Sequence, residues 1–320
     1  MMQALQFSST GTLNSLQLRD VPRPVPVAGE VLVEVRAAGL NPSDVKNVLG
    51  RFPYTTVPRI PGRDFSGVVV EGPQELLGKA VWGGTGKGFG FTRDGCHTQY
   101  VAVPANAIAL KPESLTFAQA ATIGVPFITA WDALERSQVG TGTRVLILGA
   151  GAVARAAQAL AQARGASVVV GSRRAEVVQE LGSQGVTAFE LQGEDRLAEQ
   201  ARDRFEQNSP EVIFDTTGHW LGPAINALAP FGRVAVIAAP ADGLVSTPVL
   251  DLYRRGGSII GVNSLLYSLE ECARMLEQIG AAFEGAFPPP RNFIELPLSD
   301  AVPAYNKLNE GGSEKVVLTP

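Results

Sequence analysis

The spacing of hydrophobic residues differs between the first part of the chain and its middle. Up to about residue 120, short runs of β-branched residues are separated by Pro and Gly. Clear examples are residues 30–35 (EVLVEV), 67–70 (GVVV) and 99–103 (QYVAV). Short strands broken by turn residues predict a mostly-β, barrel-like domain in this region.

Residues 123 to 263 instead alternate short apolar runs with Ala-rich stretches that favour helix. Strands are predicted at residues 145–148, 168–170, 212–214, 234–237 and 258–262. Helices are predicted over residues 152–164 and much of 196–206. Alternating strands and helices are typical of a parallel, doubly wound sheet, so the chain is predicted to be an α/β protein. The remaining residues, 264–320, contain a predicted helix over 269–279 and a final predicted strand over 315–318.

Composition narrows the class of protein. The 320 residues suffice for about two domains of ordinary size. Hydrophobic residues make up 45% and charged residues 18%, which favours a large core over a disordered chain. The net charge of −4 argues against a nucleic-acid partner. With no apolar run of about 18 residues and no secretory signal, we expect no membrane span and a cytoplasmic location.

The strongest local motif is residues 144–157 (RVLILGAGAVARAA), where a predicted strand runs directly into a predicted helix. Gly149 permits the tight turn, Gly151 lets the backbone approach a pyrophosphate, and Ala154 lets the helix pack on the strand. Ala152 and Val153 open the helix, whose N-terminus supplies unpaired N–H groups and the positive end of its dipole. In this strand–turn–helix context the motif predicts a bound dinucleotide rather than a plain turn.

The second predicted strand of this region ends in Gly171, Ser172, Arg173 and Arg174 rather than in a carboxylate. An acidic residue there would bind the ribose hydroxyls of NAD. A hydroxyl and two guanidiniums suit a 2′-phosphate, so the sequence predicts NADPH as the cofactor. The alternative is an exposed helix start with incidental arginines, although Arg is disfavoured at that end of a helix.

Another Gly-rich run, residues 83–90 (GGTGKGFG), superficially suggests a phosphate-binding loop. Lys87 is followed by Gly88 instead of Ser or Thr, and the first glycine is misplaced. We therefore expect a flexible surface or lid-like loop.

The order and spacing of five segments resemble the medium-chain dehydrogenase/reductase superfamily, in its zinc-free quinone oxidoreductase branch. The segments are residues 29–50 (GEVLVEVRAAGLNPSDVKNVLG), 57–69 (VPRIPGRDFSGVV), 120–134 (AATIGVPFITAWDAL), 149–154 and 232–240 (GRVAVIAAP). The resemblance implies a GroES-like, mostly-β catalytic domain from residues 1–122 completed by 264–320. It implies a Rossmann-like nucleotide domain over 123–263, with the active site in the cleft between the two domains.

The resemblance also allows a test for zinc. Zinc alcohol dehydrogenases of this superfamily have a cysteine where this chain has Asn41, and a histidine where it has Arg63. An amide and a guanidinium do not replace Cys and His as zinc ligands. The other two candidates, His97 and His219, do not occur in ligand spacing, and Cys96 and Cys272 are too few for a four-cysteine structural site. We therefore expect no metal.

Three residues are candidates for a catalytic role. Asn41 follows a strand and would offer its amide to a substrate carbonyl, with an ordinary Asn-Pro turn residue as the alternative. Tyr54 would cover the pocket and donate its hydroxyl, unless it is a packing aromatic. Arg63 either pairs with a carboxylate or points toward the cofactor, and Asp64 beside it is expected to be held by hydrogen bonds or a cation. A catalytic role is disfavoured for His97 and His219, and nothing in the sequence would activate Cys96.

Further cofactor contacts follow from the resemblance and from positions at strand ends. Thr129 resembles the family's threonine near the nicotinamide ribose, although a helix-buried Thr is the plainer alternative. Thr216 lies in a segment expected to line the adenosine side. The remaining cofactor candidates end the last two predicted strands and are Ile237, Ala238, Ala239 and Asn263.

Without a zinc ion to stabilise an alkoxide, the resemblance favours hydride transfer to a quinone or an α,β-unsaturated carbonyl, with the proton from water. One alternative is a zinc-free enoyl-thioester reductase, which would want a basic entrance that residues 40–100 do not show. Another is an NADPH-binding, crystallin-like or sensor protein with little turnover. Members of the family often form homodimers through their last nucleotide-domain strands, so we expect a homodimer through residues 256–263 (GGSIIGVN).

Overall fold

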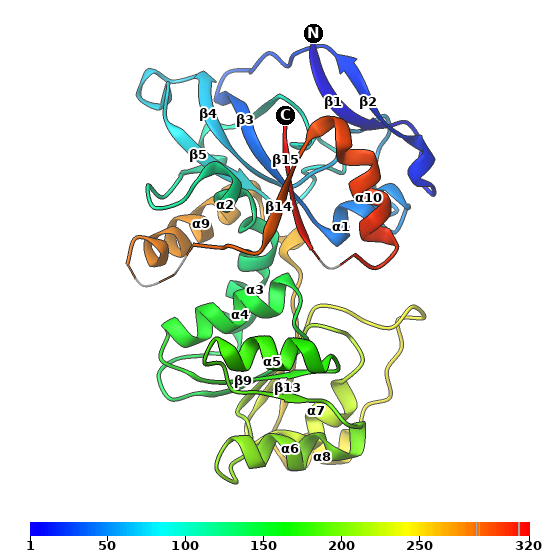
Figure 1. The fold of residues 1–320 in the computed structure, drawn as a ribbon, viewed down its shortest axis with the longest axis vertical. Coiled ribbons are helices and arrows are strands. Elements are labelled where there is room, and N and C mark those ends of the chain that lie inside the picture. The colour runs from blue at the N-terminus through cyan, green and yellow to red at the C-terminus, as the bar shows by residue number, and fades with distance from the viewer. Residues whose placement is uncertain (286, 288, 313) are drawn as a thin grey trace. The chain divides into compact units, whose positions relative to one another are not determined.

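The computed structural model describes residues 1–285, 287, 289–312 and 314–320, and it divides into two compact units (Figure 1). Unit 1 comprises Met1–Ile128 and Ser264–Pro320, and unit 2 comprises Thr129–Asn263. The first boundary lies inside helix α3 (Gly124–Arg136), whereas the sequence placed it after residue 122. The α/β class, with a mostly-β unit and a parallel-sheet unit, is confirmed.

Unit 1 is built on a seven-stranded sheet in the order β14-β15-β3-β4-β5-β7, with β6 also paired to β3. All of its pairings are antiparallel except β14 with β15. The strands are β3 (Glu30–Leu40), β4 (Asp64–Glu71), β5 (Ala80–Gly84), β6 (Tyr100–Pro104), β7 (Ile108–Leu110), β14 (Phe293–Pro297) and β15 (Lys315–Thr319). A separate antiparallel pair consists of β1 (Met2–Phe7) and β2 (Leu16–Val21).

Strand β3 is the centre of this unit because it pairs with β4, β6 and β15. It carries apolar residues on both faces, and most of its side chains are buried. Val31, Val33 and Val35 pack in one cluster with Phe65, while Leu40 belongs to a second cluster around Tyr305. The first part of β3 contains charged residues between its valines, whereas its last four residues, AAGL, are apolar and buried.

Within the described part of unit 1 lie four complete helices. They are α1 (Pro42–Val48), α2 (Phe117–Ala121), α9 (Leu269–Phe283) and α10 (Ala301–Asn309). Local sequence fixes their starts: Asp44 accepts a hydrogen bond from the backbone N–H of Asn41 at 2.8 Å, just ahead of α1. Helices α2 and α9 begin with capping boxes, in which the first residue and the residue three positions later satisfy each other's backbone N–H groups.

Unit 2 is a six-stranded parallel sheet in the order β10-β9-β8-β11-β12-β13. The strands are β8 (Arg144–Leu148), β9 (Ser167–Ser172), β10 (Ala188–Glu190), β11 (Val212–Asp215), β12 (Arg233–Val236) and β13 (Ser258–Gly261). Helices α4 (Ala152–Ala163) and α5 (Ala175–Ser183) cover one face (Figure 1). Helices α6 (Leu197–Arg204), α7 (Leu221–Ala227) and α8 (Val249–Arg254) cover the other. This sheet confirms the predicted doubly wound arrangement.

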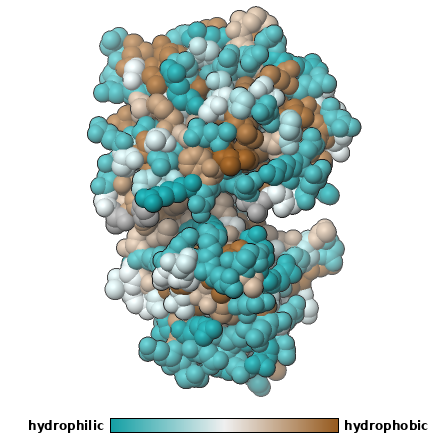
Figure 2. All heavy atoms as spheres, in the orientation of Figure 1, coloured by the Kyte–Doolittle hydropathy of each residue, from teal (hydrophilic) through white to brown (hydrophobic). Residues whose placement is uncertain are grey.

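Short 3-10 helices connect several of these elements. They are η1 (Leu13–Ser15), η2 (Gln74–Leu76), η3 (Ala105–Ala107), η4 (Glu194–Arg196), η5 (Ser264–Leu266) and η6 (Leu298–Asp300). Apolar and hydrophilic residues are interspersed over the face shown in Figure 2. Among the described residues, no helix is both long and apolar enough to cross a membrane.

The expectation of a flexible surface loop at residues 83–90 is wrong. Gly83 and Gly84 end strand β5, and Thr85 and Phe89 are fully buried. Lys87 is exposed in this segment. The glycines serve close packing: a Cβ on Gly84 would lie 1.7 Å from the carbonyl oxygen of Arg63, so no side chain fits there.

Candidate active site

The turn between β8 and α4 has the geometry that a dinucleotide requires. Gly149 has a φ of +111°, and a Cβ there would lie 2.3 Å from the hydroxyl of Thr216. That hydroxyl donates to the carbonyl of Leu148 at 2.7 Å, so Thr216 holds the turn from the neighbouring strand. Gly151 precedes α4, and a Cβ added to it would meet no atom within 4 Å. The helix N-terminus is therefore open to an anionic group.

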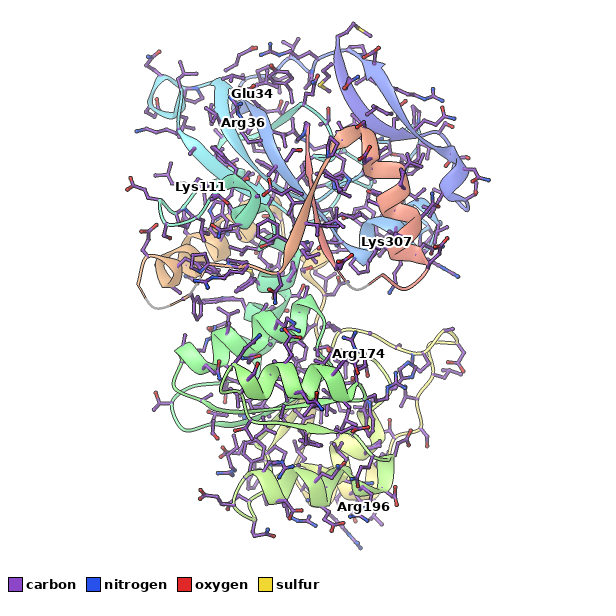
Figure 3. All side chains as sticks on the ribbon, viewed as in Figure 1. Glu34, Arg36, Lys111, Arg174, Arg196 and Lys307 are labelled. Carbon is purple, nitrogen blue, oxygen red and sulfur yellow. The ribbon has the colours of Figure 1, made fainter. Side chains whose placement is uncertain are left out.

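The end of β9 presents the two arginines that suggested NADPH. Ser172 is buried, and its hydroxyl accepts a hydrogen bond from the backbone N–H of Arg174 at 3.2 Å. Arg173 and Arg174 are exposed at the start of α5, where Figure 3 labels Arg174. The buried hydroxyl fixes the backbone, and the guanidiniums stay accessible to a phosphate.

A buried carboxylate shapes the loop after β11. Asp215 accepts hydrogen bonds at 2.8–3.0 Å from the backbone N–H groups of Thr217, Gly218 and Trp220 and from the hydroxyl of Thr217. All of these donors surround one fully buried side chain. The carboxylate thus fixes the loop at the carboxyl ends of the strands, the edge at which such sheets bind ligands.

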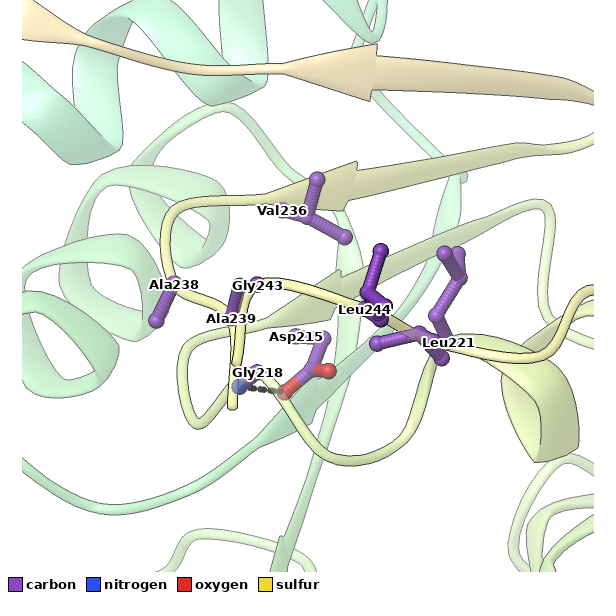
Figure 4. A pocket seen from close by; sticks show the side chains of 9 residues that line it. Asp215, Gly218, Leu221, Val236, Ala238, Ala239, Gly243 and Leu244 are labelled. Carbon is purple, nitrogen blue, oxygen red and sulfur yellow. Dashed lines mark hydrogen bonds between the residues drawn. The ribbon is translucent and has the colours of Figure 1, made fainter. Parts of the chain in front are cut away.

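Beside this loop lies a pocket of about 320 Å³ (Figure 4). It is lined by the ends of β11 and β12 and by the loop that follows β12: Asp215, Gly218, Leu221, Val236, Ala238, Ala239, Gly243, Leu244 and Val245. Two predicted cofactor residues, Ala238 and Ala239, are among them. Ile237 adjoins the pocket in sequence, Thr129 is buried in α3, and Asn263 follows β13.

In unit 1, the structure brings Asn41 and Asp64 together as one hydrogen-bonded pair. Asp64 is 1% exposed and accepts from the amide of Asn41 at 2.8 Å. It also accepts from the hydroxyl of Thr85 and the backbone N–H of Val125, both at 2.9 Å. The expectation that Asp64 is held by hydrogen bonds is confirmed.

The other end of the Asn41 amide contacts a cation that the sequence did not reveal. Lys315 donates to the Asn41 side-chain oxygen at 2.8 Å and to the carbonyl of Leu40 at 3.2 Å. Burial lowers the pKa of Lys315, and the nearby carboxylates of Asp64 and Asp44 oppose that shift. With both ends of its amide engaged and an exposure of 2%, Asn41 is a buried link between Asp64 and Lys315.

Arg63 is also buried and paired. Its guanidinium donates to the hydroxyl of Ser43, and its Nε lies 3.4 Å from an oxygen of Asp44. Burial raises the pKa of Asp44, and the charge of Arg63 opposes that rise. The ring of Phe91 lies 5.5 Å from the guanidinium carbon. Arg63 thus pairs with a carboxylate, one of the two arrangements expected for it.

Two cations and two carboxylates make up this cluster: Lys315, Arg63, Asp44 and Asp64. Their formal charges cancel, and this pairing offsets the free-energy cost of burying each charge away from water. Among the described residues, no three His, Cys, Asp or Glu side chains lie where they could hold a metal ion.

His97 is fully buried beside this cluster. Its Nδ1 accepts from the hydroxyl of Tyr305 at 2.8 Å, and its Nε2 donates to the carbonyl of Gly39 at 3.3 Å. These bonds suit the neutral imidazole, and burial lowers the pKa of His97 to about 4. Cys96 is buried too, and desolvation raises the pKa of its thiol well above the usual value. Both findings indicate structural roles for His97 and Cys96.

Tyr54 differs from the other two catalytic candidates because it is 49% exposed. Its ring lies 5.7 Å from that of Phe91 and 6.0 Å from that of Phe52. Partial burial raises the pKa of the phenol, and the charge of Arg63 opposes this effect. Of the three candidates, Tyr54 is the one that a molecule in solution can reach.

A GroES-like unit joined to a dinucleotide-binding unit defines a class of nicotinamide-dependent oxidoreductases. Two family descriptions match the chain: "Alcohol dehydrogenase GroES-like domain" over residues 27–113 and "Zinc-binding dehydrogenase" over residues 152–280. A solved structure of an alcohol dehydrogenase superfamily protein from Novosphingobium aromaticivorans aligns with a TM-score of 0.89 and 29% identity, covering 100% of both chains.

Relatives of known name agree with this class. A "zinc-type alcohol dehydrogenase-like protein" of Schizosaccharomyces pombe is 37% identical, covering 100% of this chain and 97% of its own length. The human "Quinone oxidoreductase" is 27% identical over 99% of this chain and 98% of its own. An Arabidopsis thaliana "NADPH-dependent alkenal/one oxidoreductase, chloroplastic" is 30% identical over 77% of this chain and 64% of its own. The chain belongs to the medium-chain dehydrogenase/reductase superfamily of oxidoreductases.

Proposed function

We propose that this protein is a zinc-independent, NADPH-dependent reductase that transfers hydride to a quinone or to the C=C bond of an α,β-unsaturated carbonyl. The main support comes from the residues at two positions that hold zinc ligands in the alcohol dehydrogenases of the superfamily. Asn41 and Arg63 stand there, and both are engaged within a neutral buried ion cluster. This donor set does not fit zinc, because it supplies an amide and a cation.

The proposed cofactor is NADPH. Gly149, Gly151 and the first residues of α4, Ala152 and Val153, would hold the pyrophosphate. Ser172, Arg173 and Arg174 would bind the 2′-phosphate, for which paired guanidinium hydrogen bonds are well suited. Strand-end residues complete the proposed site: Thr129, Thr216, Ile237, Ala238, Ala239 and Asn263.

Bound NADPH supplies the hydride, and the acceptor ends as a hydroquinone or a saturated carbonyl after taking one proton. Negative charge that develops on the acceptor oxygen needs one hydrogen-bond donor or a proton from water. The exposed hydroxyl of Tyr54 is the proposed donor from unit 1. Asn41 and Arg63 are proposed to support the pocket wall, since both side chains are buried and bonded to neighbouring side chains.

The proposal is tested by following NADPH oxidation with purified protein and a panel of 1,4-quinones, enones and enoyl-thioesters. We expect saturable turnover with quinones or enones, and a lower kcat/KM with NADH than with NADPH. Turnover restricted to enoyl-thioesters would instead identify an enoyl-thioester reductase. NADPH binding without turnover on any acceptor would identify a binding or sensor protein.

We also propose a homodimer. Strand β13 is an edge of the sheet of unit 2, and Ile259 on it is 39% exposed. Nearby in sequence, α8 exposes Val249, Leu250 and Tyr253 by 64%, 49% and 64%. An unpaired edge strand with apolar neighbours is a ready surface for a second copy of the chain.

A further inference from the structure

The one accessible catalytic candidate of unit 1, Tyr54, lies on a loop with no regular structure of its own. The loop, residues 51–56, connects the end of α1 to the segment before β4. A side chain that contacts a substrate must be held in place by its surroundings, because an error of about 1 Å can weaken positioning substantially. The position of Tyr54 therefore depends on the groups that hold this loop.

Asn47 is a buried group that binds this loop, and Arg59 also donates to the carbonyl and the hydroxyl of Thr56, at 3.2 and 2.7 Å. Asn47 lies in α1, is 2% exposed, and takes no part in the ion cluster around Arg63. Its side-chain oxygen accepts from the hydroxyl of Thr55 at 2.6 Å, and its side-chain nitrogen donates to the carbonyl of Gly90 at 2.7 Å. One amide therefore joins the residue next to Tyr54 to the residue next to Phe91.

The two loops that Asn47 joins are also bonded to each other. The backbone N–H of Thr56 donates to the carbonyl of Phe91 at 3.0 Å. Phe91 is fully buried, and its ring contacts both Phe52 and Tyr54, at 4.9 and 5.7 Å between centroids. The ring of Tyr54 thus packs at an interplanar angle of 50° against Phe91, which follows the glycine that the same amide binds.

The Gly90 side of this arrangement is a closely packed turn, in which the backbone N–H of Gly90 donates to the carbonyl of Arg93 at 2.9 Å. Gly90 has a φ of +80°, and a Cβ there would lie 3.1 Å from the carbonyl oxygen of Gly62. The carbonyl of Gly90 therefore belongs to a hydrogen-bonded turn, and the hydroxyl of Thr55 is the other partner of the Asn47 amide. Breaking the Thr55 bond should loosen residues 51–56 while α1 and the 88–93 loop stay in place.

We propose that Asn47, acting through Thr55 and Gly90, is a positioning residue that holds Tyr54 against Phe91 and so sets the size of acceptor that the site takes. The part concerning acceptors rests on the proposed reductase function; the part concerning the loop does not. If Asn47 only stabilised the fold, breaking its hydrogen bond would lower the stability without changing which acceptor is preferred.

The test uses Thr55→Val, which removes the hydroxyl and keeps the shape, and Thr55→Ser, which restores the hydroxyl. Thr98→Val is the matched control, because it removes a buried hydroxyl that donates to the carbonyl of Gln3 at 3.1 Å in the same unit. The readout is the ratio of kcat/KM for 1,4-naphthoquinone to that for 1,4-benzoquinone, with the KM for NADPH measured alongside.

Thr55→Val should change this ratio by about threefold or more in favour of the two-ring quinone, because without this hydrogen bond the loop that carries Tyr54 can move outward. The KM for NADPH should not change. Thr55→Ser should recover the wild-type ratio, and Thr98→Val should not alter it. In a Tyr54→Ala background, Thr55→Val should have no further effect on the ratio, since coupled residues are not additive. An unchanged ratio in Thr55→Val, or additive effects, would overturn the specificity role.

Hydrogen exchange tests the loop independently of activity. The amides of residues 51–56 should exchange faster in Thr55→Val than in wild type, and Thr55→Ser should restore their protection. Equal exchange in Thr55→Val and wild type would show that Asn47 does not hold the loop. If wild type reduces no acceptor, the proposed function fails, whereas the exchange result still decides whether Asn47 positions Tyr54.

Discussion

At the scale of single residues, the candidate site is governed by how its charges are paired. Arg63, Asp44, Asp64 and Lys315 are neutralised among themselves, and Asn41 is fixed between Asp64 and Lys315. The sequence pointed to Asn41, Arg63 and Asp64 because they stand in two segments that carry zinc ligands in the alcohol dehydrogenases of the superfamily. It did not reveal Lys315 or Tyr305, whose partners Asn41 and His97 lie 274 and 208 positions away along the chain. Pairs of that separation are created only by the fold.

Arg173 and Arg174 should determine the choice of cofactor. Replacing either with Ala removes a charge-assisted contact to the 2′-phosphate, and we expect the KM for NADPH to rise about tenfold for each variant. The KM for NADH should stay within about twofold, because NADH lacks that phosphate. Steady-state kinetics with both cofactors checks this. Arg196→Ala, on an exposed arginine elsewhere in unit 2, is the control; an equal effect on NADH would refute a 2′-phosphate site.

His97 should make the protein sensitive to acid. Its folded pKa of about 4 lies below the ordinary value of 6.5, so the unfolded chain binds the proton more readily between these values. This contribution to stability is complete above pH 6.5 and is lost as the pH falls toward 4, by about 3 kcal/mol in total. In His97→Gln the corresponding pH dependence should disappear.

Urea unfolding of both proteins between pH 4 and 7.5 measures this difference. The gap in free energy of unfolding between wild type and His97→Gln should widen as the pH rises through this window. His219→Gln, which changes an exposed histidine, is the control variant. A constant gap for His97→Gln would mean that the buried imidazole does not titrate as described.

At the scale of elements, the sheet of unit 2 was the most predictable part of the fold. Strands β8, β9, β11 and β12 are marked by short apolar runs, since parallel strands covered by helices are buried on both faces. The apolar run of β13 was predicted as well, although this edge strand is mostly exposed. In contrast, β14 and α10 were not predicted. The start of α10 contains Pro303, which looks like a helix breaker but is tolerated in a first turn, where no intrahelical N–H is needed.

Close packing between β3 and α2 leads to a prediction about glycine. A Cβ on Gly39 would lie 2.1 Å from the carbonyl oxygen of Ala121, a backbone atom that has little room to move. Gly39→Ala should therefore destabilise unit 1 by about 1–3 kcal/mol. Gly182, in α5, has open space around it, so Gly182→Ala should stabilise the protein by about 0.5–1 kcal/mol. Thermal unfolding of the two variants should show opposite shifts; a neutral Gly39→Ala would contradict the packing described.

At the scale of the whole molecule, the two units divide the work in the proposed function. Unit 2 contains the dinucleotide turn together with Arg173 and Arg174. Unit 1 contains the buried ion cluster, which does not fit zinc, and the accessible Tyr54. The fold class of each unit could be predicted from the sequence, because hydrophobic periodicity and a glycine fingerprint are local signals. The acceptor did not follow, since it depends on loops such as 51–56 whose positions are set by Asn47 and other distant contacts.

The homodimer belongs to this scale as well. Light scattering at micromolar concentration should give twice the mass of the chain. Ile259→Lys places a charge on the exposed edge strand and should give a monomer, while Leu110→Lys, on an exposed residue of unit 1, should leave the dimer intact. A monomeric wild type, or a dimer that survives Ile259→Lys, would show that β13 is not the interface.

The central claim is that reduction proceeds without zinc at the site of Asn41 and Arg63. The most direct measurement is the rate of NADPH oxidation with 1,4-naphthoquinone before and after removal of metals by a chelator, with metal content determined by mass spectrometry. The proposed function predicts saturable turnover whose rate is the same in metal-free protein and is not increased by added zinc. Loss of activity on metal removal, with recovery on adding zinc, would contradict it.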